Sequence, residues 1–358
     1  RGLGDVYKRQ EQIGPFTMDH LAWLMGSFIL ILDFIIQKFS VRYLIGDRNY
    51  RKYFPLFTLI TSFASIAWLS GDLRLMVLFW GATLLSLTLL IRVNRSWKIP
   101  YEAAKVSGKS FALGWLSLLV AVILLYVATG NWHINVTLAN DDVITSGMRF
   151  IIDMLIVLAV VVPAAQFPFQ SWLIESVAAP TPVSAIMHAG IVNAGGIILT
   201  RFSPVFNDPL AITILLIIAS ISVLLGSGIS LVHVDYKRQL VGSTMSQMGF
   251  MLVQCALGVY SAAIIHLILH GVFKATLFLQ SGSVVKRFNI PTPPSAKRSY
   301  SWVVLGRCLA IIIAILFWLG SDRSAYEILS ALILAWSLMV SWNQMVAFSR
   351  GLIGRVIG

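Results

Sequence analysis

The sequence predicts an all-α protein that crosses a membrane many times. Of its 358 residues, 58% are hydrophobic and only 12% are charged, and the mean hydropathy is +0.82. Soluble domains are usually about 45 to 50% apolar and about 25% charged. Because one core in water could not bury this much hydrocarbon, the composition excludes a soluble globular domain.

The apolar residues fall into runs of about 20, the length that a helix needs to span a bilayer. About eleven transmembrane helices are therefore expected, at 20–37, 53–70, 73–92, 111–128, 148–166, 181–201, 210–232, 240–258, 261–285, 301–319 and 326–348. We expect them to form a single transmembrane domain over residues 16–350, with its core motifs in 160–290. Residues 1–15 are set aside as an N-terminal extension, and residues 351–358 form a cytoplasmic end.

The charge distribution indicates the surroundings and the topology of the chain. The net charge is +12, from 27 Lys and Arg against 15 Asp and Glu. The basic residues lie in short clusters between the apolar runs and form no continuous patch of the kind that binds nucleic acid, so membrane lipid is the expected contact. Short cytoplasmic loops concentrate Lys and Arg. The first, third, seventh and ninth loops carry the clusters, so the chain should enter from outside and finish in the cytoplasm.

The fifth connection predicts a discontinuous helix near 163–178. Four prolines interrupt regular helix there, namely Pro163, Pro168, Pro180 and Pro182. Broken helices at membrane depth face a cavity or other protein, and transporters often place ion sites at them. The alternative is a short amphipathic helix that lies along the surface on Trp172, Leu173 and Val177, and the two interpretations are compatible.

Three ionisable residues in one apolar run predict a polar track. His266, His270 and Lys274 are four residues apart, so they line one helix face. Each costs at least about 2.5 to 3.5 kcal/mol in mid-membrane and needs water or polar partners. Since histidine titrates near pH 6.5, proton relay is the leading interpretation. Interhelical hydrogen bonding and a metal site are the alternatives. The metal alternative is the weaker because the sequence HLILH lacks the glutamate of a zincin.

A second candidate for the pathway is His188, which stands beside the broken segment. A purely structural, hydrogen-bonded histidine is the alternative. Four polar residues are candidate supporting groups: Gln166, Asn193, Asp235 and Lys237. Helix capping and membrane anchoring would equally explain the charged turn at 235–238.

The remaining polar groups predict no cofactor or metal. Cys255 and Cys308 lie in apolar runs without a CxxC partner, so neither a disulfide framework nor a metal cluster is indicated. Asp33 lies deep in an apolar run and is expected to pair with a basic group on another span. Asp153 is expected at a membrane interface.

Three stretches resemble the antiporter-like proton-translocating subunit family: FPFQSWLIESVAAPTPVSAIMHAGIVNAGGIILTRFSP (167–204), DYKRQLVGSTMSQMGFML (235–252) and HLILHGVFKATLFLQSGSV (266–284). This family includes chain L, or subunit 5, of respiratory complex I and subunits of multisubunit sodium/proton antiporters. Within it, MHAGIVNAGG together with RFSPVF most resembles the membrane subunits of bacterial inorganic-carbon uptake systems.

The resemblance implies a proton path of buried Lys and His groups near a discontinuous helix. His188 matches the family histidine after Pro-Thr-Pro-Val-Ser, and His266, His270 and Lys274 match the family's His-His-Lys helix. The family normally has further helices at both ends, so the resemblance also implies that the chain is incomplete.

Two departures from the family pattern favour the carbon-uptake branch. Gly81 follows Trp80 where energy-converting relatives have glutamate, and Pro163 stands where they have lysine. The resemblance thus implies a multi-pass subunit of the bacterial inner membrane that conducts protons and is not itself an enzyme. It would couple the proton motive force to uptake of dissolved inorganic carbon with a large cytoplasmic, zinc-containing, carbonic-anhydrase-like partner. A subunit of complex I or of a sodium/proton antiporter is the alternative.

Overall fold

The computed structural model describes residues 11–13, 16–94, 98–139, 143–283 and 300–320, with a few short stretches between 328 and 339. The chain divides into two units, Arg1–Val284 and Val285–Gly358, which are described separately. The connection between them lies outside the described residues. The expectation of one domain over 16–350 therefore stays a prediction.

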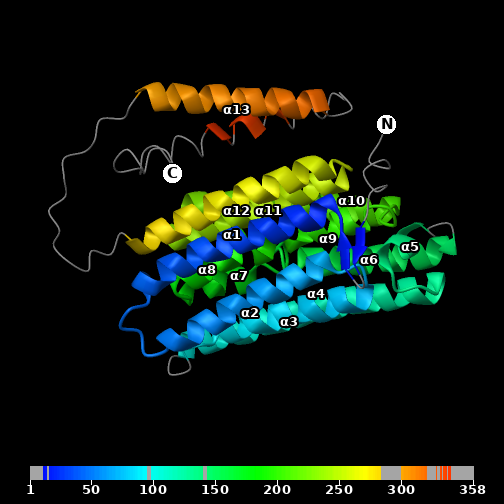
Figure 1. The fold of residues 1–358 in the computed structure, drawn as a ribbon, viewed down its shortest axis with the longest axis horizontal. Coiled ribbons are helices and arrows are strands. Elements are labelled where there is room, and N and C mark those ends of the chain that lie inside the picture. The colour runs from blue at the N-terminus through cyan, green and yellow to red at the C-terminus, as the bar shows by residue number, and fades with distance from the viewer. Residues whose placement is uncertain are drawn as a thin grey trace. The chain divides into compact units, whose positions relative to one another are not determined.

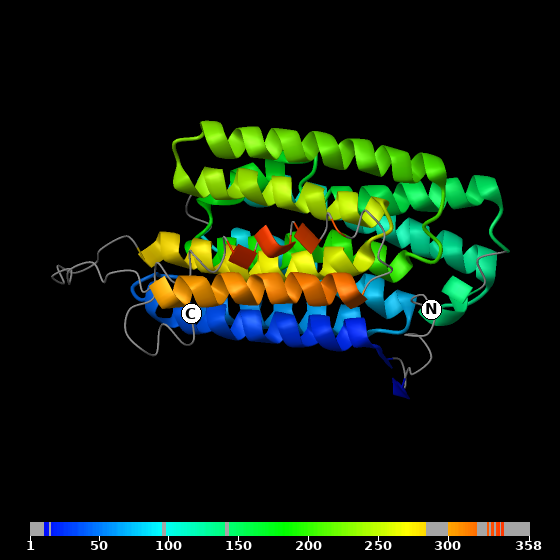
Figure 2. The same ribbon diagram turned by 90° about the horizontal axis from the view of Figure 1, so that it is seen from above.

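The first unit is a bundle of long, roughly parallel helices (Figures 1 and 2). Its long helices are α1 (His20–Tyr43), α2 (Tyr50–Leu69), α3 (Leu73–Ile91), α4 (Lys98–Thr129), α6 (Ser146–Val161), α10 (Pro209–Val232), α11 (Tyr236–Ala256) and α12 (Tyr260–Ser283). Its shorter elements are α5 (Ile134–Ala139), α7 (Ser171–Glu175), η3 (Ser176–Ala178), α8 (Thr181–Ala189), η4 (Ile191–Asn193) and α9 (Ala194–Phe202). The second unit contains α13 (Tyr300–Gly320).

The all-α membrane fold is confirmed, whereas the count of eleven spans is not. Seven segments in the described chain are long and apolar enough to cross a membrane: His20–Tyr43, Tyr50–Leu69, Leu73–Ile91, Lys98–Thr129, Thr181–Arg201, Pro209–Val232 and Tyr260–Gly282. Three further predicted spans coincide with α6, α11 and α13 and are not among the seven. Helix α6 has only 16 residues, α11 is rich in polar residues, and of α13 the segment Val304–Leu319 counts as a shorter apolar helix. The predicted span at 326–348 lies largely outside the described residues.

The discontinuous helix is present, and its packing combines both sequence interpretations. Helix α6 ends at Val161, and only the short α7 and η3 follow before α8 begins. Trp172 is fully buried, and its indole Nε1 donates to the carbonyl of Val162 at 2.9 Å. Ser171 and Glu175 remain exposed on the other face. The segment therefore has one face against the bundle and one outside it.

A second interruption divides the span predicted to run unbroken over 181–201. Helix α8 ends at Ala189, and the single turn η4 separates it from α9. Gly190 has φ −116° and ψ −72°, and Asn193 Nδ2 donates to the carbonyl of Ala189 at 2.6 Å. An amide side chain can thus replace the backbone partner that the helix no longer supplies, which apolar periodicity does not reveal.

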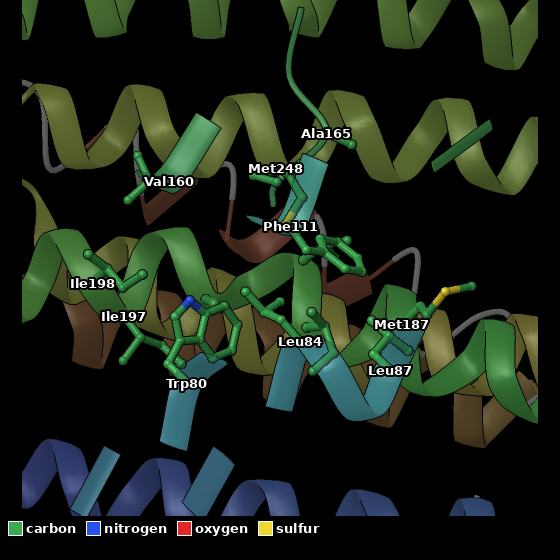
Figure 3. Close-up of a cluster of buried hydrophobic side chains, with 14 of the residues drawn as sticks. Trp80, Leu84, Leu87, Phe111, Val160, Ala165, Met187, Ile197, Ile198 and Met248 are labelled. Carbon is green, nitrogen blue, oxygen red and sulfur yellow. The ribbon is translucent and has the colours of Figure 1, made fainter. Parts of the chain in front are cut away.

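This interrupted segment lies at the centre of the core. Every residue of α8 and η4 is buried. Figure 3 shows Trp80 and Leu84 of α3 near Ile197 and Ile198 of α9. Because apolar side chains surround it, the polar groups of this segment depend on specific partners.

A small hairpin is the exception to the all-α prediction. Strands β1 (Glu11–Ile13) and β2 (Phe16–Met18) pair antiparallel, and Phe16 also pairs with Ser70. The extension predicted at 1–15 thus contributes β1 to the hairpin, and Phe16 of β2 joins the hairpin to the turn before α3.

Helices α10 and α11 meet through glycines. A Cβ atom on Gly242 would lie 2.6 Å from the backbone nitrogen of Ser230, and one on Gly226 would lie 2.7 Å from the carbonyl oxygen of Gly242. Small residues let helix backbones approach closely in membranes. The position of α11 therefore depends on these two glycines.

A buried ion pair joins three other elements. Arg201 of α9 pairs with Asp19, the N-cap of α1, and its Nη2 donates to the carbonyl of Trp68 at 2.5 Å. Only 7% of the Arg201 side chain and 11% of the Asp19 side chain are exposed. The pair therefore fixes α9 to the first turn of α1 and the end of α2.

Substituting Gly242→Ala should lower the free energy of unfolding by about 1 to 3 kcal/mol, because the new methyl group would overlap the α10 backbone. Thermal unfolding of the purified protein in detergent, followed by tryptophan fluorescence, measures the change. The matched control is Gly228→Ala, where nothing lies within 4 Å of the added Cβ. That change should be neutral or stabilise by up to about 1 kcal/mol. Equal effects of the two substitutions would contradict the close α10–α11 contact.

Substituting Arg201→Met should lower the free energy of unfolding by about 3 to 5 kcal/mol, because it leaves Asp19 buried without its partner. The same unfolding measurement applies. Arg74→Met is the control, since Arg74 also pairs with an aspartate, Asp72, but 61% of its side chain is exposed. If both variants lose the same stability, the Arg201 pair has no special role.

Candidate functional site

The site is built around Lys274, a fully buried lysine on α12. Its Nζ donates to the carbonyl of Leu240 at 3.1 Å and to the hydroxyl of Ser243, both on α11. In the part of the chain that the structure describes, no carboxylate forms an ion pair with it. The lysine is therefore held by neutral oxygens, an arrangement that suits a group that gains and loses a proton.

His188 of α8 is linked to Lys274 through α11. Its Nδ1 lies 3.2 Å from the hydroxyl of Thr244, and that hydroxyl donates to the carbonyl of Leu240 at 2.8 Å. The Leu240 carbonyl thus accepts from both Thr244 and Lys274. The His188 ring is fully buried and stacks on Phe278, with 4.3 Å between ring centroids.

The two histidines of α12 extend the group along the helix. The rings of His266 and His270 lie 6.3 Å apart, and His266 Nδ1 lies 3.2 Å from Oε1 of Gln254 on α11. His270 is 5% exposed, and no hydrogen bond to either ring nitrogen is found among the described residues. The predicted four-residue spacing thus places all three ionisable groups of α12 in one row, in which His270 and Lys274 are buried and His266 is partly buried.

Helix α11 supplies the partners of this row, which explains its low hydropathy. Ser243, Thr244 and Gln254 interact with the ionisable groups of α8 and α12. None of these three side chains was among the residues predicted for the proton path. A signal was available: polar side chains recur along a predicted span, each of them costly unless it is partnered.

Two of the predicted supporting residues stabilise the interruptions instead of touching the row. Gln166 is fully buried, and its Nε2 donates to the carbonyls of Ala164 at 2.7 Å and Met245 at 3.3 Å. Asn193 holds the break after α8 through Ala189.

The other two lie at the end of the bundle where α8 and α11 begin. Asp235 is the N-cap of α11 and accepts from the backbone N–H of Arg238 at 3.0 Å. Lys237 Nζ donates to the carbonyl of Ala179 at 3.2 Å, just before α8. Both contacts are of the capping kind that the charged turn predicted as an alternative.

The two buried aspartates differ from expectation. Asp33 accepts from Gln37 Nε2 at 2.7 Å on its own helix, and no basic group pairs with it among the described residues. Asp153 is fully buried and accepts from the backbone N–H groups of Asn207 (3.1 Å) and Asp208 (2.8 Å). An amide and two backbone groups therefore bind one oxygen of each carboxylate, where the sequence predicted a cation for Asp33 and a membrane interface for Asp153.

The two positions that depart from the family pattern are occupied by packing contacts. A Cβ atom on Gly81 would lie 2.4 Å from Nε1 of Trp115, which donates to the carbonyl of Val77 at 2.9 Å. Pro163 packs against Gly114 of α4, where an added Cβ would lie 3.0 Å from the proline Cδ. A glutamate at position 81 would have to displace Trp115.

Comparison with known proteins identifies this arrangement. The model of the NADH:quinone oxidoreductase/Mrp antiporter membrane family matches residues 70–358. The probable inorganic carbon transporter subunit DabB of Bacillus subtilis is 62% identical over 348 residues, which cover 97% of this chain and 69% of that protein. The protein of the same name from Bacillus anthracis is 58% identical and covers 97% and 68%.

A solved structure shows the same fold. One chain of the Mrp complex from Dietzia sp. DQ12-45-1b superposes with a TM-score of 0.73 at 27% identity, over 92% of this chain and 39% of that chain. The apolar helices and these relatives together show a multi-pass bacterial membrane protein. The chain belongs to the NADH:quinone oxidoreductase/Mrp antiporter family of membrane subunits, among its DabB inorganic carbon transporter members.

Proposed function

We propose that this chain conducts protons across the membrane and couples the proton motive force to uptake of dissolved inorganic carbon. The observation that carries the proposal is the row of His188, Lys274, His270 and the partly buried His266. A hydroxyl and a carbonyl of α11 link His188 to Lys274, and an amide of α11 contacts His266. The names of the Bacillus relatives support inorganic carbon as the transported species.

The chemistry of the row suits proton transfer. Imidazole can accept a proton at one nitrogen while it releases another, and a lysine amine without a carboxylate partner can exist in either state. Each group is expensive to bury, so a purely structural bundle gains little from four of them. One elementary charge crossing 100 mV releases about 2.3 kcal/mol, enough to bias the uptake equilibrium substantially.

The uptake chemistry itself is assigned to a partner. Hydration of CO2 near neutral pH is typical of a zinc-bound water, whose pKa is lowered to about 7. We place this step in a large cytoplasmic, zinc-containing, carbonic-anhydrase-like subunit. The turn with Asp235 and Arg238 at the start of α11 is a candidate docking surface, because it lies on the predicted cytoplasmic side.

Substituting Lys274→Met should lower proton-driven uptake of labelled inorganic carbon by about 100-fold or more, because the apolar side chain cannot carry a proton. Uptake is measured in cells that express the full-length protein with its native partner, with and without an uncoupler. Lys105→Met is the matched control, since Lys105 is exposed on α4, and it should leave uptake unchanged. Lys274→Met protein that reaches the membrane at normal amounts and still supports uptake would refute the proposal.

Gentle purification of the full-length protein from its native membrane should recover one large soluble partner together with bound zinc. Mass spectrometry identifies the partner, and metal analysis of the complex gives the zinc content. A set of flavin and iron–sulfur proteins would instead indicate a subunit of an NADH:quinone oxidoreductase. Several small membrane proteins would indicate an Mrp-type antiporter, the assembly in which the Dietzia structure was found.

A further inference from the structure

A small, partly open cavity of about 40 Å³ lies beside the interrupted segment, and neither Thr244 nor Lys274 lines it. Its walls come from α1, α2, α3, α12 and the stretch α8–η4–α9. Most of the lining is apolar, but Asp33, Thr61, Trp80 and Asn193 also contribute. None of these four residues belongs to the row proposed above.

Three polar atoms of the lining have no hydrogen-bond partner within the described part of the chain: Oδ1 of Asp33, Oδ1 of Asn193 and Nε1 of Trp80. Asp33 is 9% exposed, and the other two residues are each 1% exposed. The carboxylate and the amide are held in place by their other atoms, through Gln37 and the carbonyl of Ala189. Trp80 comes from α3, and its ring lies near Ile197 in Figure 3. Buried groups of this kind are rarely left unsatisfied in native proteins.

We infer that this cavity holds water and that Asp33 is a second proton-binding site, fed through that water. A cavity needs about 10 to 15 Å³ to hold a water molecule, so there is room for one or a few. Water can donate to each of the two orphan oxygens and accept from the indole N–H, so it suits all three kinds of atom. When Asp33 binds a proton, the adjacent water passes one to Oδ1 and takes a replacement from a further water or hydronium ion, so the water stays neutral and the carboxylate becomes a neutral acid. Release is the reverse.

The set of atoms disfavours a metal cation as the occupant. A sodium or calcium ion is surrounded by oxygen ligands, and calcium takes six to eight of them. Three residues of the described lining carry a side-chain oxygen: Asp33, Thr61 and Asn193. The indole N–H of Trp80 is a hydrogen-bond donor, so it cannot coordinate a cation. Asp33 is also the one titratable residue of the described lining. No neighbouring charged group in that lining therefore stabilises its ionised form.

The cavity adjoins the row on α12, so the inference deepens the proposed proton conduction and rests on it. Leu267 lines the cavity, next to His266 in the sequence and one helical turn before His270. Gly271 packs against α8, where an added Cβ would lie 2.8 Å from the carbonyl oxygen of Ala189. That carbonyl is the acceptor of Asn193. A change in the protonation of Asp33 would therefore affect the break after α8, which also positions His188.

Infrared difference spectroscopy of the full-length complex in native-like membrane tests the inference. Spectra recorded between acidic and alkaline buffers should contain a carboxylic-acid C=O band that is lost in Asp33→Asn. The same band should persist in Asp153→Asn, the control with another buried aspartate, and should shift in Asn193→Leu and Trp80→Phe, which remove partners of the water. Asp33→Asn should also lose proton-driven uptake while it reaches the membrane normally.

The band tests Asp33 independently of transport. If Lys274→Met keeps uptake but the Asp33 band is present, the proposed conduction through the row fails and the Asp33 site stands. If the band is unchanged in Asp33→Asn, the second site is overturned. A sodium requirement for uptake that disappears in Asp33→Asn, with no carboxylic-acid band in the unmodified protein, would overturn it in favour of a metal cation.

Discussion

The amino group of Lys274 imposes the constraint on which the rest of the bundle depends. A buried lysine is stable in an apolar bundle only where hydrogen-bond acceptors reach it. Here the acceptors are a backbone carbonyl and a hydroxyl of α11, at Leu240 and Ser243. Helix α11 must therefore stand close to α12 with its polar face turned inward. The glycine contact at Gly242, the residue before Ser243, fixes α11 from behind against α10.

The two interruptions in the chain, after α6 and after α8, also depend on buried hydrogen bonds. Each one releases backbone groups that lipid could not satisfy, so broken helix is tolerated only inside protein. Buried side chains take over these bonds: Trp172 reaches Val162, Gln166 reaches Ala164 and Asn193 reaches Ala189. The residues that seemed from the sequence to support a proton path thus make the irregular backbone possible, and that backbone brings His188 to Thr244.

Length and polarity were sufficient to predict most of the fold and the ionisable row. The apolar runs gave the helices because a bilayer fixes their length, and His266, His270 and Lys274 stood out because each is costly in such a run. The partners of the buried polar side chains were harder to predict from the sequence. That Arg201 would bind Asp19 depends on how helices rotate against each other, which no single run specifies. The bond from Gln37 to Asp33 is different, because four residues separate the two on one helix and the sequence already contained this spacing. The break at Gly190 was missed because its neighbours are as apolar as any continuous span.

Position 81 is a glycine and carries no charged side chain, so an aromatic side chain can occupy the space beside it. Trp115 of α4 fills the space beside Gly81 of α3, and Trp80 of α3 contributes an indole to the lining of the Asp33 cavity. The chain therefore has polar groups on two sides of one interrupted segment, with His188 before the break and Asn193 after it. Because Gly190 joins these two halves, a shift of its backbone would move both residues at once. A short break between two polar regions is thus the simplest element in this fold through which protonation on one side could alter the other.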